Sequence, residues 1–119
     1  MAPDDLLRIE RRADGPVCVL ALHGELDIST ATLLPEALGR LGRDAPGTLL
    51  VDLRGVGFID STGVRSLLHT RRWAFNRGSV VRFVCAETAV GQTIRMMGLH
   101  DVLGLTGDYD EAVSALQAA

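Results

Sequence analysis

One carboxylate and two hydroxyls occupy consecutive positions, Asp60, Ser61 and Thr62, where an apolar strand-like run changes into a helical pattern. Residues 49–53 are mostly apolar, and apolar residues recur at nearly helical spacing from Val64 onward. The first turn of a helix has backbone N–H groups without intrahelical partners and the positive end of the helix dipole. A hydroxyl placed there is well suited to receive a phosphate, so this position favours phosphorylation of Ser61.

The same tripeptide also has a purely structural interpretation. Asp, Ser and Thr are the residues that most often cap a helix N-terminus. Asp60, Ser61 and Thr62 can therefore simply begin a helix, and from the residues alone this alternative stays open.

An enzymatic interpretation requires a nucleophile, a base and an orienting group in one place. Ser61 could be the nucleophile, and His23, His69 and His100 are the available bases. None of them lies in a hydrolase, metalloprotease or phosphate-binding motif. His69 follows Ser61 by two helical turns and cannot easily reach back to it. We therefore expect no catalytic activity and no cofactor.

Two short motifs resemble those of a known family. Residues 58–64 resemble the phosphorylation loop of STAS domains, the fold of bacterial anti-sigma factor antagonists, in which an apolar residue precedes Asp-Ser-Ser/Thr-Gly. Residues 24–27 resemble a second signature of that family, Gly-Glu-Leu-Asp, at the end of an early strand. Both motifs are in register, and the resemblance covers nearly the whole chain.

The resemblance implies a role for each matching residue. Ser61 corresponds to the residue that is phosphorylated, and Thr62 corresponds to the second hydroxyl, a helix cap or an occasional second acceptor. Asp60 and Asp27 correspond to acidic residues near the phosphorylation site. Gly63 would leave room for the backbone of a partner.

The resemblance also implies partners. The unphosphorylated antagonist would bind an anti-sigma factor that is a Ser/Thr kinase of the histidine-kinase-like ATPase type, and a PP2C-type phosphatase would reverse the phosphorylation. The main alternative is a STAS subunit that binds an ABC transporter ATPase in lipid or solute trafficking. A scaffold subunit in a larger sensory assembly is a third possibility.

The family pattern usually continues with Leu-Gly where this chain has Val64 and Arg65. Arg65 can pair with a phosphate on Ser61, pair with an acidic patch on a partner, or lie in solvent. Arg65, His69 and Trp73 follow one another at intervals of four residues and are expected to line one side of the helix, as a partner-binding surface. Trp73 can instead pack at the edge of the core.

Composition limits the class of protein. The chain has 119 residues, enough for one domain (1–119), and a net charge of −3, which gives no overall attraction to nucleic acid or anionic lipid. Cys18 and Cys85 lie in apolar runs, as expected of reduced, buried thiols with no metal site. Neither a signal-peptide pattern at residues 1–5 nor a membrane-spanning apolar stretch is evident. We expect a cytoplasmic protein.

The periodicity predicts a single α/β domain, a small mixed β-sheet with about four helices packed on it, in agreement with the STAS fold. A turn at 44–47 closes the first helix, which Ser29 and Thr30 are expected to cap. The expected strands are residues 6–12, 17–22, 48–53, 80–85 and 102–105. The expected helices are residues 29–41, 61–76, 88–97 and 108–119.

Overall fold

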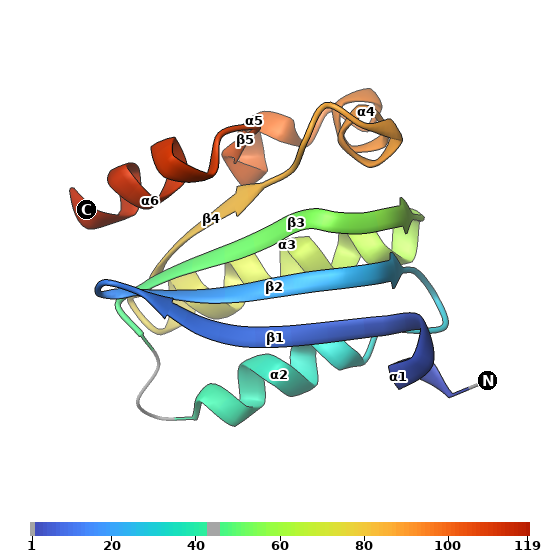
Figure 1. Cartoon of the computed structure of the whole chain (residues 1–119), viewed down its shortest axis with the longest axis horizontal. Helices are drawn as coiled ribbons and strands as arrows, with labels where there is room; N and C mark the ends of the chain where they lie inside the picture. The colour runs from blue at the N-terminus through green and yellow to red at the C-terminus, as the bar shows by residue number, and fades with distance from the viewer. Residues whose placement is uncertain (1, 43–45) are drawn as a thin grey trace.

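The computed structural model describes residues 2–42 and 46–119 and shows an α/β fold around one five-stranded sheet (Figure 1). The strands lie side by side in chain order; the first two are antiparallel and each later neighbour is parallel, so the expected mixed sheet is confirmed. The strands are β1 (Leu7–Asp14), β2 (Val17–Leu26), β3 (Thr48–Ile59), β4 (Val80–Val84) and β5 (Leu105–Thr106).

The described part of the chain contains four longer helices, which match the four expected ones, and two single-turn helices that were not predicted. None of them is both long and apolar enough to cross a bilayer. The predicted turn at 44–47 falls partly on residues 43–45, outside the described residues. The longer helices are α2 (Leu33–Leu41), α3 (Ser61–Asn76), α4 (Ala89–Met96) and α6 (Tyr109–Gln117). The short ones are α1 (Pro3–Leu6) and α5 (His100–Leu103).

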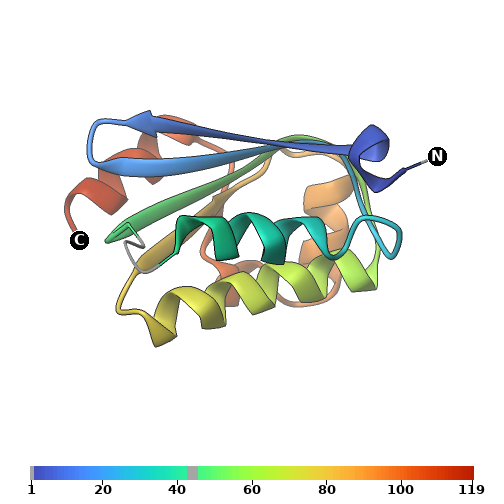
Figure 2. The same ribbon diagram turned by 90° about the horizontal axis from the view of Figure 1, so that it is seen from below.

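Helices cover the two faces of the sheet unequally. α2 and α3 run side by side beneath one face (Figure 2), where Leu22, Leu38 and Leu67 belong to the main core and are almost fully buried. α6 packs on the other face, where Val113 and Leu116 meet apolar side chains of β2, β3 and β4. Each fully buried aliphatic side chain contributes about 1.5–3 kcal/mol. These contacts fix α3 firmly against the sheet.

β3 continues past Gly55 to Ile59, although the sequence predicted that the strand ends near Leu53. Two register shifts relative to β2, between Ala21 and His23 and between Gly24 and Glu25, take up the extra residues of β3. At the first shift, a Cβ on Gly55 would lie 2.7 Å from the backbone carbonyl oxygen of Leu22, which disfavours any residue other than glycine there. Because β3 is longer than predicted, Asp60 lies directly after its C-terminal end, level with the end of β2.

The predicted strand at 102–105 is wrong except for its last residue, Leu105. Val102 belongs to α5 and is 45% exposed, and only Leu105 and Thr106 pair with β4. Gly104, in the left-handed region at φ 61°, ends α5 and turns the chain into β5. An apolar run of this length is too short to show a hydrophobic period. It is therefore compatible with one helical turn as well as with a strand.

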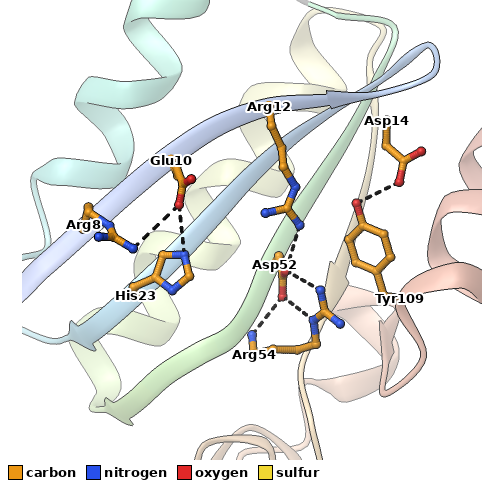
Figure 3. A network of polar contacts seen from close by, with 8 residues as sticks. All are labelled: Arg8, Glu10, Arg12, Asp14, His23, Asp52, Arg54 and Tyr109. Carbon is orange, nitrogen blue, oxygen red and sulfur yellow. Dashed lines mark hydrogen bonds and ion pairs between the residues drawn. The ribbon is translucent and has the colours of Figure 1, made fainter.

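A charged cluster lies on the sheet face that carries α6 (Figure 3). The carboxylate of buried Asp52 accepts hydrogen bonds from Arg54 Nε at 3.0 Å and Nη2 at 2.9 Å, and Arg12 Nη2 lies 3.5 Å away. The Tyr109 ring packs under Arg54, with 4.5 Å from its centroid to the guanidinium, and its hydroxyl donates to Asp14 at 3.0 Å. The cluster thereby attaches α6 to the hairpin.

The pKa of Asp52 reflects two opposing effects. Burial alone raises it, but the hydrogen bonds and charge of Arg54, together with the charge of Arg12, outweigh burial and hold the pKa below its usual value. The ionised form of Asp52 is thus favoured in the folded protein.

We expect Asp52→Asn to lower the free energy of unfolding at neutral pH by about 1–3 kcal/mol, because the two arginines lose their shared counter-charge. Since the folded-state pKa of Asp52 is lowered, its contribution is present above the unfolded-state pKa and lost as pH falls through the folded-state pKa. In urea unfolding, the gap between the variant and the wild type should therefore narrow from neutral pH to about pH 3. Glu10→Gln, an exposed carboxylate on the same face, is the control and should have little effect. A gap independent of pH would contradict the assignment.

Candidate functional site

The Asp60 carboxylate connects two loops at the end of the sheet. It is the N-cap of α3: its Oδ1 accepts a hydrogen bond from the Gly63 N–H at 2.9 Å. Its Oδ2 accepts one from the Ile28 N–H at 3.2 Å, on the loop that follows β2. Asp60, rather than Thr62, is therefore the cap of this helix. Because both carboxylate oxygens are engaged, the two loops are held in one fixed arrangement.

The loop after β2 has its own side-chain hydrogen bonds. Asp27 Oδ1 accepts from the Ser29 N–H at 2.9 Å, and the buried Thr30 hydroxyl donates to the Glu25 carbonyl at 2.8 Å and accepts from the Asp27 N–H. The expectation that Ser29 and Thr30 cap a helix is wrong, because α2 begins only at Leu33. Thr30 instead closes this turn. Asp27 lies in the loop that Asp60 holds, with its carboxylate bonded within that loop.

Gly63 serves the packing of α3 and leaves no space for a partner. It is buried, and a Cβ there would overlap the carbonyl oxygen of Leu26 and approach Ile59 Cγ1 to 2.9 Å. The expected room for the backbone of another protein is thus filled by the end of β2. The glycine allows the first turn of α3 to contact β2 directly.

Ser61 is the first residue of α3 and is exposed, whereas Thr62 is half-buried. Among the described residues, none forms a hydrogen bond with the Ser61 hydroxyl, histidines included. The Asp60 cap satisfies the Gly63 N–H, while the Ser61 and Thr62 N–H groups have no intrahelical partner. The hydroxyl therefore lies in solvent at the positive end of the helix dipole.

Of the three residues expected to form one surface, two do so. Arg65 and His69 are exposed, but Trp73 is only 8% exposed, its ring packed 4.5 Å below the Arg77 guanidinium. Successive steps of four residues rotate by about 40° around a helix, so the third residue turns into the core. The spacing i, i+3, i+7 would have identified Leu68 and Arg72. These two line a shallow groove of about 320 Å³ with Arg65 and His69.

Two exposed apolar side chains near the site were missed. Ile28, in the loop after β2, is 76% exposed, and Phe58, near the end of β3, is 51% exposed. Ile28 donates its N–H to Asp60, and Phe58 lies two residues before it in β3. In the sequence, both looked like ordinary strand or loop residues. Exposed apolar groups close in the fold to a functional loop are typical of a protein-binding surface.

Gly63→Ala should lower the free energy of unfolding by about 1–3 kcal/mol, because the added methyl group forces α3 away from the Leu26 carbonyl. Gly57→Ala is the matched control, since a Cβ at Gly57 has no neighbour within 4 Å and the residue lies in an extended strand. Urea unfolding monitored by circular dichroism measures both. Equal stabilities of the two variants would show that Gly63 is not required for packing.

Comparison with known proteins agrees with this geometry. The family model described as "Mlab, STAS domain" matches residues 9–115. The anti-sigma-F factor antagonist RsfB of Mycobacterium tuberculosis is 31% identical over 118 residues, which cover 98% of this chain and 93% of that protein. The anti-sigma-B factor antagonist of Staphylococcus aureus is 25% identical over 82% of this chain and 90% of its own length. The crystal structure of an anti-sigma factor antagonist from Mycobacterium paratuberculosis matches with a TM-score of 0.85 and 26% identity, covering 98% of this chain and 99% of the other. The chain therefore belongs to the STAS-domain family and is a member of the anti-sigma factor antagonists within it.

Proposed function

We propose that this protein regulates a sigma factor by partner switching in the cytoplasm. In its unphosphorylated form it binds an anti-sigma factor of the histidine-kinase-like ATPase type, which thereby releases its sigma factor. The same partner phosphorylates Ser61, with Thr62 as a possible second acceptor, and this ends the binding. A PP2C-type phosphatase restores the free hydroxyl. ATP and Mg²⁺ belong to the kinase, and this chain is its substrate and ligand.

The observation that carries this proposal is the position of Ser61. Its hydroxyl is exposed at the first position of α3, while Asp60 holds the surrounding loops in place. A kinase needs an accessible hydroxyl in a defined geometry, and this site has both. The exposed side chains of Ile28 and Phe58 add apolar surface on which a protein partner could pack.

A phosphate on Ser61 should alter binding more than it alters the fold. It adds a charge of about −1.5 to −2. The helix N-terminus stabilises this charge by about 0.3–1 kcal/mol, while the neighbouring carboxylates of Asp60 and Asp27 repel it, so the two effects nearly cancel within the domain. In a dry interface, the same dianion would lose its hydration, at a cost of several kcal/mol. The switch therefore acts at the interface.

The proposal is tested by affinity purification from the native lysate, with wild type, Ser61→Glu and Ser114→Glu as baits. Ser114 is exposed on α6 and gives the same change of charge away from the site. We expect wild type and Ser114→Glu to retain a histidine-kinase-like ATPase and Ser61→Glu to lose it. Incubation of the retained ATPase with ATP and wild-type protein should then place one phosphate on Ser61, as read by mass spectrometry.

Two results would contradict the proposal. If all three baits retain the same ABC transporter ATPase, Ser61 is only a helix residue and the protein is a transport subunit. If Ser61→Glu and Ser114→Glu weaken binding of the kinase equally, the negative charge acts non-specifically. Urea unfolding of the three proteins should give nearly equal free energies of unfolding. This result would exclude misfolding as the cause of any loss of kinase binding.

A further inference from the structure

The outward side of α3 forms one continuous stripe that starts at Ser61. With about 100° of rotation per residue, the stripe residues all project within about 40° of the direction of Ser61. They are exposed except Leu68, which is partly buried and packs on the core, and Phe75 at the far end is 82% exposed. We define this α3 stripe as Ser61, Arg65, Leu68, Arg72 and Phe75.

The α3 stripe is positively charged and carries no compensating acid. The segment Ser61–Asn76 contains no Asp or Glu. Within the described residues, Arg65 and Arg72 form no ion pair, whereas Arg12 and Arg54 pair with Asp52 and Arg95 pairs with Glu87. In a chain of net charge −3, the segment Ser61–Asn76 therefore carries three arginines and no acidic residue.

The α3 stripe also has a recess suited to an apolar side chain. Arg65, Leu68, His69 and Arg72 line the groove of about 320 Å³, in which Leu68 supplies the apolar surface and the other three its polar rim. Arginine stems can cover apolar surface while their guanidinium groups stay in water. The groove can thus receive one apolar side chain flanked by two carboxylates.

We propose that the α3 stripe docks an acidic amphipathic segment of the protein partner, a helix or loop that presents carboxylates to Arg65 and Arg72 and an apolar residue to Leu68. This inference rests on the proposed function, because it names the chemistry of the partner surface that Ser61 controls. Charge complementarity selects this occupant, since the stripe offers cations without counter-charges. A segment matching the length of α3 would span about 24 Å.

The α3 stripe gives phosphorylation a second means of action. A phosphate on Ser61 lies four residues before Arg65 on the same side of the helix, where the two side chains are neighbours. Its charge of about −1.5 to −2 offsets the two positive charges of Arg65 and Arg72. The phosphate thereby removes the attraction for an acidic segment as well as occupying its docking position.

The test compares Arg65→Gln/Arg72→Gln with Arg71→Gln, an exposed arginine on the flank of the same helix. Affinity for the purified kinase partner is measured by titration calorimetry at low and high salt. We expect the double variant to bind about tenfold more weakly at low salt and to show a flatter salt dependence, because rim charges act through screened attraction. Arg71→Gln should stay within about twofold of wild type. Equal effects of the double variant and the control would overturn the proposal.

A second experiment does not depend on the kinase. Amide chemical shifts of the labelled domain are followed during titration with an acidic amphipathic helical peptide of Glu and Leu, and with its Gln-for-Glu analogue. We expect shifts along the α3 stripe with the acidic peptide only, and none in Arg65→Gln/Arg72→Gln.

The outcomes separate this inference from the proposed function. If Ser61→Glu still loses the kinase while the stripe variant binds normally, partner switching stands and the docking proposal fails. If no kinase binds but the peptide shifts map to the α3 stripe, the docking surface stands and the proposed function fails. Absence of stripe shifts with the peptide, or tighter binding of duplex DNA or phosphatidylglycerol vesicles to the same residues, would overturn the docking proposal.

Discussion

The site depends on one carboxylate that holds together two segments far apart in the chain. Asp60 accepts the N–H of Ile28 and the N–H of Gly63, so that the loop after β2 and the start of α3 share one anchor. The parallel pairing of β2 and β3 brings these segments to the same edge of the sheet, and the missing side chain of Gly63 lets them touch. Each hydrogen bond contributes only about 1 kcal/mol, yet together they decide where the Ser61 hydroxyl lies.

The site and the domain core are stabilised by different kinds of interaction. Leucine and valine side chains fix the helices on the sheet, and the cluster around Asp52 attaches α6 to the opposite face through Tyr109. This cluster lies on the sheet face opposite α3, so its charges leave the outward side of α3 unchanged (Figure 3). Arg12 and Arg54 are thus paired within the structural cluster, whereas Arg65 and Arg72 on the outward side of α3 form no ion pair with any described residue.

The local sequence pattern was sufficient to predict those features that depend on a single helix or strand. The start of α3 at Ser61 was predictable because apolar spacing and capping residues agree there. Thr30 and Gly63 were assigned wrong roles because their environments are tertiary: Thr30 bonds a strand carbonyl, and Gly63 meets the end of another strand. The role of Trp73 stayed undecided, although the rotation of about 40° for every four residues already turns it away from Arg65 and into the core. No pattern in the neighbouring sequence reports contacts between residues 26 and 63.

The hydrogen bond between Ile28 and Asp60 joins residues that are 32 positions apart. The surface around Ser61 consequently exists only after both halves of the sheet have paired, whereas an unfolded or newly made chain carries the same short motif without that shape. An enzyme that recognises both loops together would modify folded molecules and would not modify chains that have yet to fold. Under the proposed function, a phosphate on Ser61 would therefore also report that the domain has completed its folding.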